Sequence, residues 1–252
     1  MDLARIASLT LLILGIISLV NSVIFSSTHL AFIGLGLTFW GALLLYIKPT
    51  KYIKASLLHS IVLPTLSTLN QIVTELNIKG KAIYLPPKTL EEIKKGKMFI
   101  PTVKETTPKT KKLSQKTIFS KNPHGIYITP PGNDLTNLYE ETLGTTFTKV
   151  DLNYLQANLP KLLIEDLEIA EDIEINIQKS KIQIKIISPI FGEFCKQARE
   201  YPNICNSIGC PICSSLACAI TRITAKPVTI ENAKLSENAK IIDVTFRILE
   251  ES

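Results

Sequence analysis

Two long apolar runs near the N-terminus constrain this chain more than any other feature. Residues 6–25 and 30–47 contain no Asp, Glu, Lys or Arg, and each run has about the length of a helix that crosses a bilayer. Only residues 26–29 separate the runs. The sequence therefore predicts a tight transmembrane hairpin within residues 1–50. A cleaved secretory signal is the alternative, but the first run is long for such a signal and a second run follows at once.

Small residues in the two runs predict close packing between the helices. Gly34 and Gly41 lie on one face of the second run, and Ser18 and Ser22 lie four residues apart in the first. Such positions let two membrane helices approach closely. The other interpretation is that small residues are simply common in membrane helices.

Charge predicts the orientation of this hairpin. Lys48, Lys51 and Lys54 follow the second run, whereas the turn between the runs has no Lys or Arg. Because short cytoplasmic loops are enriched in these residues, we expect a multi-pass protein of the cell membrane with its N- and C-termini in the cytoplasm.

The lysines also predict the partner of the membrane-proximal part. Residues 48–121 carry fifteen Lys against four Glu, whereas residues 122–252 carry twelve Lys and Arg against seventeen Asp and Glu. A basic segment beside the anchor favours contact with the anionic headgroups of the lipid bilayer. Nucleic acid is disfavoured as a partner, because the lysines are not interleaved with aromatic residues and no nucleic-acid-binding motif is present.

The rest of the chain predicts an α+β fold in three parts. Residues 51–80 have the period of a juxtamembrane helix, which Pro64 is expected to kink or split. Residues 81–132 contain short extended segments and a Lys- and Thr-rich loop, residues 104–124, that we expect to be mobile. Residues 133–252 are predicted to form an α+β domain similar to ligand-binding domains.

Alternating isoleucines give the most specific structural prediction in that last part. Ile173, Ile175 and Ile177 precede a turn at residues 179–180, and Ile182, Ile184 and Ile186 follow it. This pattern predicts a β-hairpin with one apolar face. With a helix after Pro211 and strands near residues 228–230 and 241–249, the expected result is an antiparallel sheet with helices packed on one face.

The order of elements from residue 143 to residue 248 resembles the small-molecule-binding domain named after 4-vinyl reductase, a distant relative of subunits of vesicle-tethering transport particles. The resemblance rests on LGTTF, the Ile-rich hairpin ending in Ser-Pro, SSLACAI in the helix, and AKPVTIE before the last strand. It implies an apolar cavity against the helix that holds a small hydrophobic or lipid-like ligand. We expect the cavity to be lined by Ile184, Ile212, Leu216 and Ile220.

This resemblance has limits along the chain. The segment NAKLSENAKIIDVTF lacks the cysteine and the Gly-Asp pair that the family usually carries before its last strand. A metal or redox role of the family is therefore not carried over to this chain by the resemblance. Residues 1–130 show no resemblance to a known family.

The cysteines suggest a second kind of site. Candidate ligands for zinc are Cys195, Cys205, Cys210 and Cys213, and the spacing of this segment is also superficially similar to that of plant-type iron–sulfur proteins. Cys218 is expected to project from another side of the helix. Two alternatives stay open: the cysteines pack as small buried side chains, or Cys205 forms a disulfide with Cys210 or Cys213, which a reducing cytoplasm disfavours.

The sequence favours a binding protein over an enzyme. It contains no phosphate-binding glycine loop, no HExxH and no GxSxG motif. We expect a membrane-anchored cytoplasmic domain that binds a small hydrophobic or lipid-like ligand and acts as a sensor or regulator. One alternative is a metal- or redox-responsive membrane protein that uses the cysteines from Cys195 to Cys218. Another is a scaffold whose hairpin assembles with a protein partner or a second copy.

Overall fold

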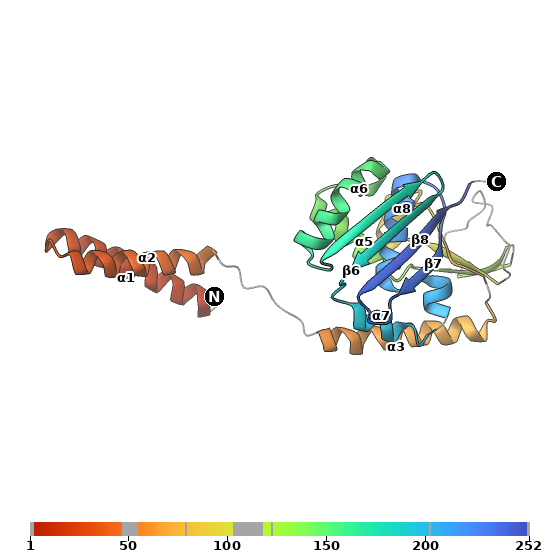
Figure 1. Cartoon of the computed structure of the whole chain (residues 1–252), viewed down its shortest axis with the longest axis horizontal. Coiled ribbons are helices and arrows are strands. Elements are labelled where there is room, and N and C mark those ends of the chain that lie inside the picture. Colours follow the sequence, from red (N-terminus) through yellow and green to blue (C-terminus); the bar gives the residue numbers. More distant parts are fainter. Residues whose placement is uncertain are drawn as a thin grey trace. The chain divides into compact units, whose positions relative to one another are not determined.

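The computed structural model divides the chain into two compact units, Met1–Lys54 and Ala55–Ser252. It describes residues 3–46, 55–78, 80–102, 118–121, 123–201 and 203–250. Figure 1 presents the elements of both units in order along the chain.

The first unit is a hairpin of two apolar helices, α1 (Leu3–Ile24) and α2 (Thr28–Tyr46). Both helices are long and apolar enough to cross a membrane, by length and composition. The predicted close packing at Gly34 is confirmed, because a Cβ added there would lie 2.8 Å from the backbone nitrogen of Leu19. A Cβ at Gly41 would likewise lie 2.8 Å from the backbone nitrogen of Leu12.

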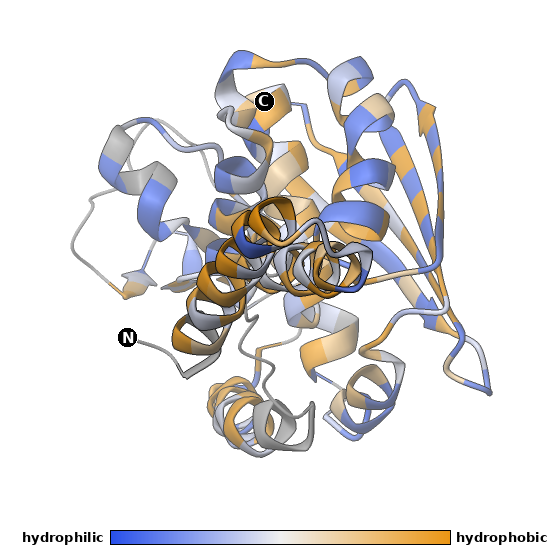
Figure 2. Ribbon diagram, turned by 90° about the vertical axis from the view of Figure 1, so that its left-hand side faces the viewer, coloured by the Kyte–Doolittle hydropathy of each residue, from blue (hydrophilic) through white to orange (hydrophobic). Residues whose placement is uncertain are grey.

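Apolar side chains cover the outside of this hairpin. Figure 2 shows both helices orange along most of their length, in contrast to the strands at the right, where orange and blue alternate. Large exposed side chains near the middle of the two helices include Leu14, Ile17, Phe32, Leu35 and Phe39. Within the described part of the first unit, the hairpin therefore buries its small residues and exposes its large apolar ones.

The second unit is α+β and is built on one eight-stranded antiparallel sheet with the order β3-β4-β2-β1-β7-β8-β6-β5. The strands are β1 (Ile83–Tyr84), β2 (Met98–Pro101), β3 (Phe119–Lys121), β4 (His124–Ile128), β5 (Asp172–Gln178), β6 (Lys181–Ile187), β7 (Val228–Leu235) and β8 (Ile241–Ile248). The prediction of an α+β class with an antiparallel sheet is confirmed.

The isoleucine hairpin has the predicted register. Ile173 pairs with Ile186, Ile175 with Ile184 and Ile177 with Ile182. Burial alternates along β6 and β8, because successive side chains of a strand point to opposite faces of a sheet. One face of this half of the sheet is therefore in the core.

Helices and helical turns complete the second unit. They are α3 (Ala55–Glu75), α4 (Leu90–Lys95), α5 (Asn133–Leu143), η2 (Phe147–Lys149), α6 (Leu152–Lys161), η3 (Leu162–Asp166), α7 (Gly192–Ala198), η4 (Ile204–Ile208) and α8 (Pro211–Thr224). Helix α8 contacts β7, β8 and α5, and Figure 1 shows α5 and α8 behind strands β6 and β8. Two helix ends are capped. The Asp151 carboxylate accepts from the Tyr154 backbone N–H at 2.9 Å at the start of α6, and Gly144 adopts a left-handed conformation with φ of 64° at the end of α5.

Several local predictions differ from the structure. Pro64 lies inside a single helix, α3, and does not split it. Pro160 lies inside a helix as well, near the end of α6. Residues 119–121 of the predicted loop form β3, because they pair with β4. Residues 103–117 and 122 of that region lie outside the described part of the chain.

The short strands of residues 81–132 belong to the same sheet as the C-terminal strands. Strand β1 joins the two halves by pairing with both β2 and β7. In the half formed by β1, β2 and β4 both faces are buried: Tyr84, Met98 and Ile100 enter the main core, whereas Ile83, Phe99 and Tyr127 form a second apolar cluster. One sheet therefore contains strands from residues 81–132 and from residues 133–252, which the sequence assigns to separate parts of the chain.

Candidate functional site

Helix α8 is the most buried helix of the second unit, and both predicted sites involve it. Every residue from Ile212 to Arg222 is buried. The four predicted pocket residues, Ile184, Ile212, Leu216 and Ile220, are at most 4% exposed and belong to one continuous core cluster. The structure thus brings these residues together as core packing, and a ligand among them stays a prediction.

The cysteines predicted as metal ligands gather from three segments. Cys195 lies in α7, Cys205 lies in the turn η4, Cys210 caps the N-terminus of α8, and Cys213 lies in its first turn. We call these four residues the thiol cluster. All of them are free, and only Cys205 is partly exposed.

Gly209 makes the approach of η4 to α8 possible. Its φ of 91° falls in the region that side chains rarely adopt. A Cβ at this position would also lie 2.4 Å from the Cδ1 atom of Ile230. The chain can therefore turn directly from the segment with Cys205 into the helix with Cys210.

Cys210 influences the pKa values of the other three thiols in the cluster. The thiols of Cys195 and Cys213, and then the backbone N–H groups of Cys213 and Ile212, hold the pKa of Cys210 well below its usual value despite burial. The Cys210 side chain makes no cap hydrogen bond of ordinary geometry, and these two N–H groups lower its pKa less than the two thiols do. A helix N-terminus stabilises a thiolate in this way.

The other thiols of the cluster favour the protonated form. The interaction with Cys210 and burial raise the pKa values of Cys195 and Cys213. Burial raises the pKa of Cys205 to about 12, and its sulfur donates to the Ala198 carbonyl at 3.6 Å. Cys210 is therefore the most acidic of four thiols that interact with one another, and a lowered pKa favours thiol oxidation and metal binding.

The metal interpretation stays a prediction. In the part of the chain that the structure describes, no group of three or more His, Cys, Asp or Glu side chains is arranged to hold a metal ion. The four predicted ligands do interact electrostatically with one another.

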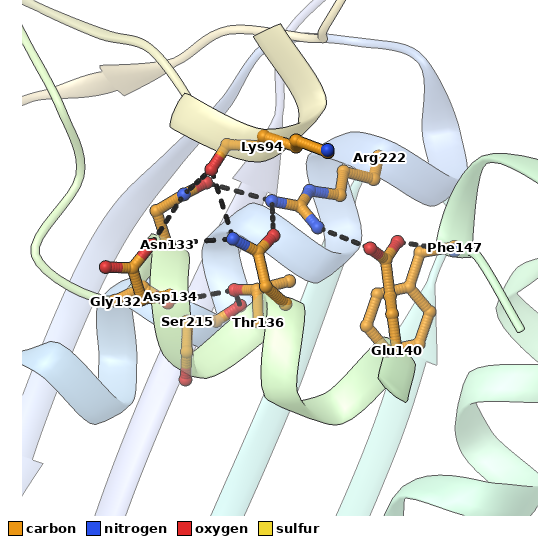
Figure 3. Close-up of polar contacts among 10 residues, drawn as sticks. Lys94, Gly132, Asn133, Asp134, Thr136, Glu140, Phe147, Ser215 and Arg222 are labelled. Carbon is orange, nitrogen blue, oxygen red and sulfur yellow. Dashed lines mark hydrogen bonds and ion pairs between the residues drawn. The ribbon is translucent and has the colours of Figure 1, made fainter. Parts of the chain in front are cut away.

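A buried polar network on the other side of α8 has no counterpart in the sequence predictions. The Arg222 guanidinium donates to Glu140 of α5 at 2.7 Å, and the second Glu140 oxygen accepts from the Phe147 backbone N–H at 2.7 Å. Arg222 also donates to the side-chain oxygens of Asn133 at 2.9 Å and Asn137 at 2.8 Å. Figure 3 shows these side chains converging from α5 and α8.

Helices α5 and α8 touch through their backbones at the start of α5. A Cβ added at Gly132 would lie 2.1 Å from the backbone nitrogen of Ser215. Beside it, Thr136 donates to the Ser215 carbonyl at 2.9 Å (Figure 3). In the sequence, the local signals of this contact are a glycine before α5 and an arginine that is the single charged residue of α8.

A small recess adjoins this network. Its volume of about 10 Å³ leaves room for about one water molecule. The residues that line it include Tyr84, Lys97, Asn133, Cys218 and Arg222. Cys218 thus lies apart from the thiol cluster, as the sequence predicts, and none of the four predicted pocket residues lines this recess.

Comparisons with known proteins give a family. The model of a family described as domain of unknown function (DUF7982) matches residues 3–247. The chain therefore belongs to this family, and the match covers both units. No curated protein and no solved structure matches the chain.

Proposed function

We propose that this member of the DUF7982 family is a membrane-anchored regulatory domain. The hairpin of α1 and α2 crosses the cell membrane twice, and the second unit faces the cytoplasm, where it responds to a chemical signal without catalysing a reaction. The polytopic topology and the orientation are part of this proposal.

The outward-facing apolar surface of the hairpin carries the proposal. Phe32 is 76% exposed, Leu35 64% and Ile17 51%. In water each such side chain would cost about 1.5–3 kcal/mol relative to burial. A bilayer removes this cost, and about twenty helical residues match its hydrocarbon thickness.

The lysine distribution supports the cytoplasmic orientation. The three lysines that follow the second apolar run, at positions 48, 51 and 54, lie outside the described residues, so this argument rests on the sequence and the positive-inside bias. In this proposal the chain interacts with the lipid bilayer through its hairpin and the lysines that follow it.

Membrane extraction tests the anchor. Membranes from cells that express the full chain are washed with alkaline carbonate, and the protein is expected to stay in the pellet. Ile17→Arg together with Leu35→Arg should reduce the pelleted fraction, because each charge costs about 2.5–3.5 kcal/mol near the centre of a bilayer. Leu138→Arg is the matched control, since Leu138 is an exposed leucine of α5. Release of the unmodified protein by carbonate contradicts the proposal.

A small hydrophobic ligand is one candidate for the signal. The resemblance to the domain named after 4-vinyl reductase supports it, and the ligand would lie against α8, between Leu216 and Ile184. Because these side chains are packed in the core, the ligand would have to open its own cavity. Mass spectrometry of molecules that co-purify with the detergent-extracted chain tests this candidate, and a Leu216→Trp variant should lose the molecule that the unmodified chain retains.

Thiol chemistry is the second candidate, and a specific observation favours it. The thiol cluster brings together cysteines from α7, η4 and α8 around Cys210, whose pKa is lowered. Metal analysis before and after alkylation of the thiols distinguishes a metal-responsive protein from a redox-responsive one. Stoichiometric zinc or iron that is lost on alkylation indicates a metal-responsive protein, whereas metal-free protein with reactive thiols indicates a redox-responsive one.

A further inference from the structure

Cys210 and Cys213 occupy the N-cap and N3 positions of a helix N-terminus, and their two thiols interact with each other. Cys210 is the N-cap of α8 and Cys213 is its third residue, with Pro211 and Ile212 between them. In capping motifs the side chains at these two positions reach across the first turn. The Ser214 backbone N–H donates to the Cys210 carbonyl at 2.8 Å, so the turn is closed.

We propose that Cys210 and Cys213 are a reversible dithiol–disulfide pair that is oxidised by a small peroxide. The proposal rests on the thiol-based candidate described above and adds the bond that forms and the class of oxidant. It requires no metal ion.

The reaction balances in two steps. The Cys210 thiol first loses its proton, and the thiolate attacks one oxygen of hydrogen peroxide. This forms a sulfenic acid and releases hydroxide, which takes up that proton to become water. The Cys213 sulfur then loses its proton and attacks the Cys210 sulfur, and the departing hydroxide takes up a proton to become water. In sum, two thiols lose two electrons and two protons, and one peroxide becomes two water molecules.

Position favours Cys213 over the other thiols as the second partner. Only two residues separate it from Cys210, so little chain entropy is lost on closing the bond. Cys195 lies in α7, and a bond from it would fix two helices to each other. The Cys205 sulfur is engaged with the Ala198 carbonyl.

Burial favours a small oxidant. Cys210 is 5% exposed and Cys213 is 3% exposed, which leaves little space for a bulky disulfide such as oxidised glutathione. Hydrogen peroxide is uncharged and not much larger than water, so local opening around η4 suffices to admit it.

Peptide mass spectrometry tests the proposal on the full chain in detergent. Trypsin releases residues 200–222, which contain Cys205, Cys210, Cys213 and Cys218, and separately residues 186–196, which contain Cys195. After hydrogen peroxide and alkylation, the 200–222 peptide should carry two fewer alkyl groups than the reduced control and lose the mass of two hydrogen atoms. Reduction with dithiothreitol before alkylation should restore both missing alkyl groups. Fragmentation should find no backbone cleavage products between residues 210 and 213, as expected when a bond closes that loop.

Variants identify the bond independently. Cys210→Ser and Cys213→Ser should each abolish the oxidised peptide, while Cys205→Ser and Cys218→Ser should retain it. Circular dichroism reports whether each variant is folded, and the fragmentation pattern of the unmodified protein needs no variant. A cross-link between the 186–196 and 200–222 peptides, retention of the bond in Cys213→Ser, or reduced thiols after peroxide treatment would each overturn the proposal.

Failure here is distinguishable from failure of the proposed function. If the thiols bind stoichiometric zinc or iron, the disulfide proposal fails while a thiol-based signal survives. If carbonate releases the chain from membranes, the anchor fails whatever the state of the cysteines.

Discussion

The guanidinium of Arg222 in α8 lies 2.7 Å from the carboxylate of Glu140 in α5, and both side chains are buried. Glu140 also accepts from the backbone N–H of Phe147, and Arg222 also donates to two asparagine side chains of α5. Because every one of these partners is fixed by α5 or the turn after it, the pair sets how α5 lies on α8. The thiol cluster and the predicted pocket residues are carried by the same helix, α8.

Breaking this ion pair should destabilise the second unit strongly. Glu140→Gln leaves the Arg222 charge buried without its carboxylate, which is expected to cost about 3–5 kcal/mol. Urea unfolding of the full chain in detergent, followed by circular dichroism, measures this loss. Glu141→Gln is the matched control, because Glu141 is the exposed neighbour in α5, and it should change the free energy of unfolding by no more than about 0.5 kcal/mol. Similar values for the two variants would show that the pair does not hold α5 in place.

The packing of α8 leads to a second prediction. Leu216 is fully buried, so Leu216→Ala should lower the free energy of unfolding by about 2–5 kcal/mol. Thermal unfolding of the variant with and without added fatty acid measures the effect. A loss well below this range, without fatty acid, would show that space is already present next to Leu216, as the ligand candidate requires.

Alkaline pH should weaken the fold through buried thiols. Burial raises the pKa of Cys218 to about 12, from an ordinary value of 9.0. Its neutral form thus contributes stability that is complete below about pH 9 and is lost progressively up to about pH 12, because the unfolded chain ionises first.

The measurement compares urea midpoints at about pH 8 and about pH 10. The midpoints give the free energy of unfolding at each pH. Cys218→Ser should reduce the difference between these two free energies by about 1 kcal/mol. An unchanged difference would mean that Cys218 does not titrate in the unfolded chain as expected, or that it is not buried in solution.

The hairpin should tolerate a larger residue at one glycine and not at another. Gly34 faces α1, whereas a Cβ at Gly36 would meet nothing within 4 Å. Gly34→Val should therefore separate the helices and cost about 1–3 kcal/mol, while Gly36→Val should have little effect. The single tryptophan, Trp40, lies in α2, so its fluorescence during titration with dodecyl sulfate reports the unfolding of the hairpin. Equal midpoints for the two variants would contradict the close packing at Gly34.

Local periodicity made much of the fold predictable. The alternation from Ile173 to Ile186 determined the register of β5 and β6, and the spacing of apolar residues after Pro211 determined α8. Both patterns are long enough to be unambiguous. Strands β1 and β3 are only two and three residues long, so no alternation could show that residues 81–132 extend the same sheet.

The sites were predictable to a smaller extent. The turn at Gly209 brings the segments of Cys195, Cys205, Cys210 and Cys213 near one another, while their role as metal ligands stays a prediction. The pair of Arg222 and Glu140 was not predicted, since 82 residues separate the two and no local pattern connects them. A lone arginine within an apolar helix face is the signal that points to such a partner.

Protease accessibility on the two sides of the membrane tests the anchored, inward-facing arrangement most directly. Intact cells and inverted membrane vesicles that carry the full chain are treated with protease, and fragments of residues 55–252 are followed with an antibody to this unit. We expect cleavage in inverted vesicles alone, with the hairpin retained in the membrane pellet. Cleavage of the second unit in intact cells, or recovery of the uncleaved chain away from membranes, would contradict the account.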